Sequence, residues 1–316
     1  MSWVFLAGDR VYKFKKPVAF PFLDHRSLAA RARNCTVEAK DNAVLAPDTY
    51  LGIAALLDEG NGRLRLGSVG ENGEVVEWLV VMKRLDREKT LEAKLDAGTV
   101  REHDIACVAD RLIAHYRSED ARTADGGAYL RHLEVEQEAN RKILLRPGFD
   151  LGGELNAVAV DEVDQRFAAV RPELAARVAA GFIVDGHGDL RPEHIWLGDP
   201  LQIFDRLEFD PKMRLLDPYD ELNYLGLECA IHGAPWVQPF LLDRLRTALG
   251  HPPSDALLDF YTAFRAVLRA RICLAHLLDD VPMTPEVWPG MARAYLERMP
   301  GAQANMTPSD RIGGRI

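Results

Sequence analysis

The sequence is poor in cysteine and has no long uncharged run. Its 316 residues include only four cysteines, and none of these forms a C-x-x-C pair or a cysteine–histidine cluster. This pattern argues against a disulfide framework and a structural zinc site, and it is typical of a reducing compartment. No segment approaches the roughly 18 uncharged residues that a membrane helix needs, and the first residues lack the basic segment of a signal peptide. We therefore expect a cytoplasmic protein with no membrane partner.

Positive charge is also in deficit. The chain carries 39 Lys and Arg against 48 Asp and Glu, a formal net charge of −9, which argues against nucleic acid as the main partner. No G-x-x-x-x-G-K-[ST] pattern occurs in the sequence, so a P-loop phosphate site is excluded. Hydrophobic residues make up 47% and charged residues 28% of the chain, proportions that indicate a globular protein and exclude a fibrous or disordered one.

The first eighty residues have the pattern of a sheet with one inserted helix. Gly8 and the Asn72-Gly73 pair mark hairpin turns between strand-like segments. Ser27 is placed to cap a helix that ends near Leu45, before an Ala-Pro pair. We expect strands at about 3–6, 11–15, 50–57, 64–69 and 75–82.

After Met82 the spacing of apolar residues becomes mainly helical. Thr99 and Glu102 have the pattern of a capping box, with a helix running on to about Tyr116. Three short strand-like segments, at 182–184, 195–197 and 201–204, enclose a polar loop. We therefore expect an α+β chain of two lobes, with a small lobe at 1–84, a larger helical lobe at 85–316 and a hinge at 82–85.

The polar loop at residues 187–195 reads H-G-D-L-R-P-E-H-I, and a strand-like segment ending in Asp205 follows it. An acid, a cation two residues on and a further ligand five residues on are typical of phosphoryl transfer. Asp189 would take the proton of a hydroxyl, and Arg191 would offset charge on the moving phosphoryl group. His194 and Asp205 would be the ligands of Mg²⁺.

Two other interpretations of this loop stay open at this point. The carboxylates could belong to an ordinary surface turn. Alternatively, His187, Asp189 and His194 could form a transition-metal site of a hydrolase, although no further histidine cluster supports it.

The loop resembles the catalytic loop of the kinase-like superfamily. It is close to the protein-kinase pattern H-R-D-L-K-P-E-N-I, and its H-G-D opening is that of the aminoglycoside phosphotransferase and choline kinase branch. The resemblance places Asp189 on the catalytic aspartate, Arg191 on the phosphate-contacting lysine and Asp205 on the metal-binding aspartate. His194 replaces the metal-binding asparagine, and because imidazole suits softer metals, Mn²⁺ is a second candidate metal.

The resemblance covers about residues 3–280 and extends to the nucleotide site. It places Lys13 on the strand residue that contacts the α- and β-phosphates, with Lys15 as the substitute, and Glu38 on its ion-pair partner in the following helix. Met82 and Arg84 fall on the hinge whose backbone binds adenine. Residues 11–21 and 46–52 are most similar to an uncharacterised bacterial subgroup of phosphotransferase-domain proteins.

The resemblance implies a bilobal, protein-kinase-like fold whose small lobe lacks the first strand and the glycine-rich loop. It implies ATP- and Mg²⁺-dependent phosphorylation of a hydroxyl on a small-molecule substrate. The alternative is a nucleotide-binding pseudokinase with a regulatory or scaffolding role, which the short N-terminus and His194 favour. A protein kinase is disfavoured because no A-P-E segment follows Asp205.

Several charged residues have two interpretations. Glu208 could bind metal or anchor the loop after Asp205. Asp220, in a segment similar to the D-x-x-Y-D-L-A motif of the same branch, is expected to be structural. Three arginines of a C-terminal helix could contact an anionic substrate or form ion pairs, and the second is favoured: Arg265, Arg269 and Arg271.

Overall fold

The computed structural model describes residues 2–20, 23–60, 62–118, 127–149, 151–152, 154–279 and 282–301. The contacts between residues divide the chain into two units. The first consists of Met1–Ala121 and Asp185–Arg214, and the second of Arg122–Val184 and Leu215–Ile316. The expected lobe boundary at residue 84 stays a prediction.

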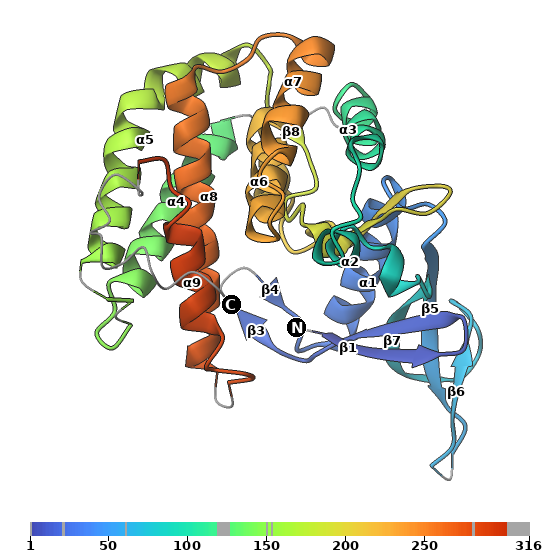
Figure 1. Ribbon diagram of the computed structural model, residues 1–316. Helices are drawn as coiled ribbons and strands as arrows, with labels where there is room; N and C mark the ends of the chain where they lie inside the picture. Colours follow the sequence, from blue (N-terminus) through green and yellow to red (C-terminus); the bar gives the residue numbers. More distant parts are fainter. Residues whose placement is uncertain are drawn as a thin grey trace. The chain divides into compact units, whose positions relative to one another are not determined.

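The first unit is built on an antiparallel five-stranded sheet with the order β1-β2-β7-β5-β6. Helix α1 packs on strands β5 and β7, and Figure 1 shows it beside this sheet. The elements of the sheet region are β1 (Ser2–Ala7), β2 (Arg10–Lys15), β3 (Ala19–Phe20), β4 (Leu23–Asp24), α1 (Leu28–Ala43), β5 (Tyr50–Asp58), β6 (Leu64–Gly67) and β7 (Glu74–Lys83). All five predicted strands of this region are therefore found.

The rest of the first unit carries the polar loop. Short strands β9 and β10 pair antiparallel on its C-terminal side. The elements are a 3-10 turn (Arg87–Lys89), α2 (Leu91–Asp96), α3 (Glu102–Tyr116), the end of β8 (Val184–Asp185), a 3-10 turn (Pro192–His194), β9 (Ile195–Trp196), β10 (Gln202–Ile203) and a 3-10 turn (Pro211–Arg214).

Helix α1 begins as its sequence predicts and turns one polar residue toward the sheet. The Ser27 hydroxyl accepts the backbone N–H of Ala30 at 3.2 Å, which is an N-cap. Cys35 packs in a buried cluster with residues of β5 and β7. Glu38 lies one turn further on the same face of the helix and is therefore buried as well.

The predicted capping box of helix α3 is wrong by two residues. The helix begins at Glu102, but its N-cap is Arg101, whose N–H donates to the Asp104 carboxylate at 3.0 Å. The Thr99 hydroxyl instead donates to the carbonyl of Lys94, at the end of α2. The short connection between the helices thus draws Thr99 to the preceding helix end.

The second unit is helical, and α8 packs against α4, α5, α6 and α9 (Figure 1). Its elements are α4 (Gly127–Leu144), α5 (Leu155–Ala179), the start of β8, β11 (Leu215–Leu216), α6 (Pro218–Ile231), α7 (Val237–Leu249), α8 (Asp255–Ala275), a 3-10 turn (His276–Leu278) and α9 (Trp288–Leu296). The expectation of an α+β fold with a β-rich N-terminal part and a helical C-terminal part is confirmed. None of the described helices has both the length and the apolar composition needed to span a bilayer.

The three arginines of α8 form ion pairs inside this unit. Arg265 holds Asp220 through two hydrogen bonds of 2.8 and 2.7 Å, which gives Asp220 the structural role expected for it. Ion pairing within the helical unit is thus the interpretation that the contacts bear out. The pairs are Arg265–Asp220, Arg269–Glu228 and Arg271–Glu136.

The carboxylate of Asp217 contacts three helices of the second unit, α5, α6 and α8. Its carboxylate caps α6 by accepting the N–H of Tyr219 at 2.9 Å. The same carboxylate pairs with Arg177 of α5 and accepts the hydroxyl of Tyr261 of α8 at 3.1 Å. Asp217 is fully buried, so its removal leaves a buried guanidinium without its counter-ion.

We expect the substitution Asp217→Ala to lower the free energy of unfolding by about 3–5 kcal/mol, because it breaks a buried ion pair and removes a cap. Chemical denaturation measures this loss. Asp243→Ala is the matched control, because Asp243 is 74% exposed and pairs with Arg246 only at the surface. Equal stability of the two variants would show that Asp217 does not hold the helices.

Candidate active site

Strand β2 places the ammonium group of Lys13 between two carboxylates, those of Glu38 and Asp205. Its ammonium nitrogen lies 2.8 Å from Oε1 of Glu38 and 2.7 Å from Oδ1 of Asp205. Helix α1 supplies Glu38, and the segment after β10 supplies Asp205. The structure therefore brings together three residues that lie far apart in the sequence and that the resemblance assigned to one site.

Lys15 lies two residues further along β2, on the same face of the strand. Its ammonium group contacts the second oxygen of Glu38, Oε2, and lies 2.7 Å from Oε1 of Glu208. The side chain of Lys15 is 1% exposed and that of Lys13 is 15% exposed. Lys15 is thus enclosed by two carboxylates, and Lys13 is the lysine that a ligand can reach.

The charges of Lys13, Glu38 and Asp205 support one another despite their burial. Burial alone would lower the pKa of Lys13, but Glu38 and Asp205 raise it well above its usual range. Burial would raise the pKa of Glu38, but the two ammonium groups lower it. In the same way, the Lys13 ammonium group outweighs burial and lowers the pKa of Asp205. Lys13, Glu38 and Asp205 are therefore all charged near neutrality.

The polar loop is bonded to the segment after β10, which carries Asp205. The N–H of Phe204 donates to the carbonyl of His194 at 2.9 Å, and that of Leu207 donates to the carbonyl of His187 at 3.1 Å. Gly188 has φ +88°, and a Cβ on it would lie 2.9 Å from a methyl group of Leu207. The left-handed backbone at this position favours glycine.

His194 is oriented by its own loop. Its Nδ1 lies 2.9 Å from the carbonyl oxygen of Asp189, an acceptor, so we assign the ring proton to Nδ1. The lone pair of Nε2 then faces Oδ2 of Asp205 at 3.6 Å. Two electron-rich atoms that face each other across this gap fit a shared divalent cation, and an imidazole with a carboxylate suits Mn²⁺ as well as Mg²⁺.

His187 has a structural position. It is fully buried, and its Nε2 lies 2.9 Å from the carbonyl oxygen of Phe204. Burial and the neighbouring His194 lower the pKa of His187 to about 3, so its ring is neutral. Among the described residues no group of three or more His, Cys, Asp or Glu side chains could hold a metal. The hydrolase site considered for this loop is therefore not found there.

Asp189 and Arg191 are both partly exposed. The carboxylate of Asp189 is 32% exposed, and its Oδ2 lies 4.0 Å from Nδ1 of His194. Arg191 pairs with Glu193 at 2.6 Å on the same loop. The predicted base is thus accessible, and the predicted cation has a partner that a phosphate would have to replace.

The predicted hinge residues lie in different places. Met82 is inside the sheet, where it pairs with Val11 of β2 and Tyr50 of β5. The N–H of Arg84 donates to the carbonyl of Asp9 at 2.8 Å, so it is already engaged. The side chain of Arg84 nevertheless lines a cavity, whereas Met82 does not.

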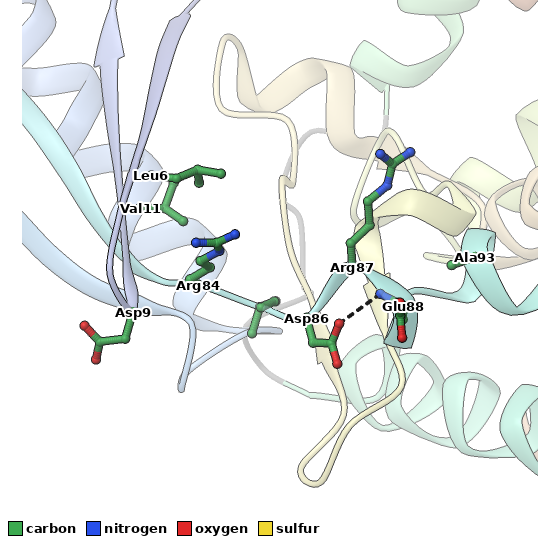
Figure 2. A pocket seen from close by; sticks show the side chains of 9 residues that line it. Leu6, Asp9, Val11, Arg84, Asp86, Arg87, Glu88 and Ala93 are labelled. Atoms are coloured by element: carbon green, nitrogen blue, oxygen red, sulfur yellow. Dashed lines mark hydrogen bonds between the residues drawn. The ribbon is translucent and has the colours of Figure 1, made fainter.

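This cavity has a volume of about 850 Å³ and lies beside the β1–β2 hairpin and the segment that follows β7. Figure 2 shows Leu6 and Val11 close to Arg84, with Asp86, Arg87 and Glu88 further along the same segment. Leu85 and Ala93 complete its apolar lining. A flat base could rest between these apolar side chains.

Two residues that support Asp205 were not predicted. The N–H of Asp205 donates to the hydroxyl oxygen of Tyr50 at 3.1 Å, and the N–H of Arg206 donates to Oδ1 of Asn42 at 2.7 Å. Asp205 has φ +61°, a left-handed backbone that is rare outside glycine. Asn42 follows Glu38 by one helical turn, and that spacing was the one signal for it in the sequence.

The sequence is similar to two uncharacterised mycobacterial proteins. No protein-family model matches the chain. Uncharacterised proteins of Mycobacterium bovis and Mycobacterium tuberculosis are 31% identical to it over 281 residues, which is 85% of this chain and 52% of each relative. The chain therefore spans about half the length of these curated relatives.

A solved structure shares the architecture. The crystal structure of a choline/ethanolamine kinase family protein from Mesorhizobium loti aligns with 96% of this chain and 87% of its own, with a TM-score of 0.52 and 16% identity. The chain has a choline kinase-like fold. At this identity the likeness concerns the fold alone, so the chemistry has to be argued from the residues.

His115 of α3 supports the beginning of the polar loop. It is buried, and its Nε2 lies 2.9 Å from the carbonyl oxygen of Asp185. Burial lowers the pKa of His115 below its ordinary value of 6.5. The folded protein therefore keeps this ring neutral at a pH where the unfolded chain has begun to protonate it.

This difference predicts a pH dependence of stability. The contribution of His115 is complete above pH 6.5 and is lost as the pH falls toward the lowered pKa of the folded state, by at most about 1.4 kcal/mol per pH unit for one proton. In His115→Gln, whose amide can still donate to Asp185, the free energy of unfolding should fall less between pH 7 and pH 5. The exposed His103→Gln variant is the control, and identical slopes for wild type and His115→Gln would refute the assignment.

Proposed function

We propose that the protein is a phosphotransferase that uses ATP and a divalent metal ion to phosphorylate a hydroxyl group of a small molecule. The observation that carries this proposal is the ammonium group of Lys13, which bridges Glu38 and Asp205 at 2.8 and 2.7 Å. The choline kinase-like fold supports it. Nucleic acid and membrane partners have no part in it.

Lys13 and the cavity would hold the nucleotide. The ammonium of Lys13 is fixed by two carboxylates and remains partly exposed, so it can bind phosphate oxygens without losing its orientation. The cavity beside Val11 and Arg84 would take the base. We assign the hydrogen bonds to the base to the backbone at Leu85, because the N–H of Arg84 is engaged by Asp9.

Asp205 and His194 would hold the metal ion. Such an ion, when bound, offsets negative charge on the phosphate groups of ATP. Oδ1 of Asp205 pairs with Lys13 and Oδ2 faces His194, so each carboxylate oxygen has a separate task. The hydrogen bonds that the N–H groups of Asp205 and Arg206 donate to Tyr50 and Asn42 keep the backbone of this segment in place.

Asp189 would accept the proton of the substrate hydroxyl. Its carbonyl oxygen is tied to Nδ1 of His194, which fixes the backbone of the loop while the carboxylate stays partly exposed. Arg191 would exchange Glu193 for the transferred phosphoryl group. This ion pair is only partly buried, so a phosphate with two negative charges can displace Glu193.

A nucleotide-binding pseudokinase is the second candidate. Two observations favour it: among the described residues His194 and Asp205 are joined by no third metal-binding side chain, and Arg191 is engaged with Glu193. Such a protein would bind Mg²⁺-ATP and be stabilised by it, but would transfer no phosphoryl group. Turnover therefore separates the two candidates.

The substitution Asp189→Asn tests the assignment of the base. Phosphoryl transfer from ATP to a panel of choline-like, ethanolamine-like and aminoglycoside alcohols should fall about 10²- to 10⁴-fold, because the loop loses its proton acceptor. Binding of Mg²⁺-ATP should persist, seen as a rise in melting temperature for wild type and variant. Asp199→Asn, an exposed position nearby, is the control. Unchanged turnover in Asp189→Asn would remove this residue from the mechanism.

His194→Asn tests the metal site. We expect wild type to prefer Mn²⁺-ATP over Mg²⁺-ATP more strongly than the variant does, by about tenfold, because an amide oxygen is a harder ligand than imidazole. Isothermal titration with both metals at one pH gives the ratio of the two dissociation constants. The exposed His103→Asn variant should keep the wild-type ratio. If His194→Asn keeps it too, His194 does not bind the metal.

A further inference from the structure

The site contains a second buried ion pair beside the one that the resemblance indicated. Lys15 lies 2.7 Å from Glu208 and also contacts Glu38, and its side chain is 1% exposed. The side chain of Glu208 is 5% exposed, and that of Glu38 is fully buried. The carboxylate of Glu38 is therefore shared, with Lys13 on one oxygen and Lys15 on the other.

Glu208 follows Asp205 by three residues, so this second pair anchors the segment that carries Asp205. The backbone N–H groups of Phe204, Asp205, Arg206 and Leu207 are all bonded, to His194, Tyr50, Asn42 and His187 in that order. Glu208 ends this run of bonds with a charged contact to β2. The left-handed residue Asp205 is thus held from both sides.

The burial of the pair excludes direct contact with a ligand. Lys15 has Glu38 and Glu208 around its ammonium group and is closed to solvent. Glu208 pairs with Lys15, and its side chain is 5% exposed. The side chain of Asp205 is 41% exposed. Of the two interpretations of Glu208 from the sequence, the contacts therefore favour the anchor over the metal ligand.

We propose that Lys15 and Glu208 are positioning residues, which fix the Asp205 carboxylate relative to Lys13 and thereby set the affinity of the site for metal-bound nucleotide. This inference rests on the proposed function. Lys15 holds Oε2 of Glu38, so that Oε1 is left to face Lys13. Without Lys15, the Glu38 carboxylate is free to turn, and Lys13 can leave Asp205.

The charges of the cluster allow a double substitution that leaves its net charge unchanged. Lys13 and Lys15 oppose Glu38, Asp205 and Glu208, so the removal of one lysine with one glutamate leaves the net charge unchanged. The double variant Lys15→Met/Glu208→Met also keeps the volume of both side chains nearly constant. Replacement of a buried ion pair by apolar residues is often neutral for stability. Glu38 loses one of its two ammonium partners here, so the melting temperature of the variant is measured beside its binding.

The test measures how strongly Mg²⁺ enhances ATP binding. Isothermal titration gives the dissociation constant of ATP with Mg²⁺ and with EDTA, and their ratio is the enhancement. In the double variant we expect this enhancement to fall about 10- to 100-fold, as for residues that orient metal ligands. Binding of ATP in EDTA should fall less than this, because Lys13 keeps its ion pair with Glu38 and can still contact the phosphates. Hydrogen exchange of the ligand-free protein should become faster at the amides of residues 204–207.

The matched control is Arg31→Met/Glu77→Met. Arg31 of α1 and Glu77 of β7 form a comparable ion pair, 2.8 Å long and 10% and 18% exposed, on the same helix and sheet. This control should share any general loss of melting temperature but keep the enhancement and the exchange rates at 204–207. If the Lys15/Glu208 double variant behaves like the control, the inference is overturned.

Two further outcomes are informative. If wild type binds no ATP in either condition, the proposed function fails, and hydrogen exchange alone decides the inference: faster exchange at 204–207 supports the anchor, and unchanged exchange overturns it. If the double variant does not fold, Glu208→Gln takes its place, since glutamine keeps an oxygen for Lys15. It should show a smaller loss of enhancement, and a wild-type value would overturn the inference.

Discussion

The carboxylate of Glu38 is the group on which the arrangement of the first unit depends. A buried carboxylate is stable only when positive charge compensates it, and Glu38 receives one ammonium group on each oxygen. Both lysines come from strand β2. Lys13 also forms an ion pair with Asp205, and Lys15 forms one with Glu208. A helix, a strand and a loop from a distant part of the sequence are thereby tied at one point.

This arrangement gives two lysines of one strand different properties. Lys13 and Lys15 have the same side chain, face the same side of the sheet and share one carboxylate partner. Their difference is access to solvent, because Lys15 lies deeper under the segment that ends at Glu208. A chemically useful lysine needs a fixed position and an open side, and here the second lysine provides the fixed position for the first.

Much of the fold followed from local patterns in the sequence. Alternating strands, the Asn72-Gly73 turn and the Ser27 cap act over a few residues, and all were found close to their expected places. The grouping of Lys13, Glu38 and Asp205 is a long-range feature, and it followed from a resemblance because no local pattern encodes it. The structure reproduces it by distances alone.

The details that sequence reasoning missed depend on competition between partners. Thr99 had the pattern of a cap but bonds to the end of α2, which lies nearer to it. The N–H of Arg84 was expected to be available to a base, but a tight hairpin brings the carbonyl of Asp9 within 2.8 Å. Glu208 had two roles in the sequence, and only the burial of Lys15 decided between them. Such choices depend on which group is closest after folding, and spacing along the chain does not report that.

The division of the first unit between two distant stretches of chain has a consequence for synthesis on the ribosome. Residues 1–121 leave the ribosome before residues 185–214 exist, because the chain is made from its N-terminus. During that interval Glu38 and its two lysines lack Asp205 and Glu208, and the lysine charges that these carboxylates balance stay uncompensated. The charged face of the sheet can therefore gain these two partners only after the helices between residues 127 and 184 have been made. A chain that stops before residue 205 lacks both carboxylates.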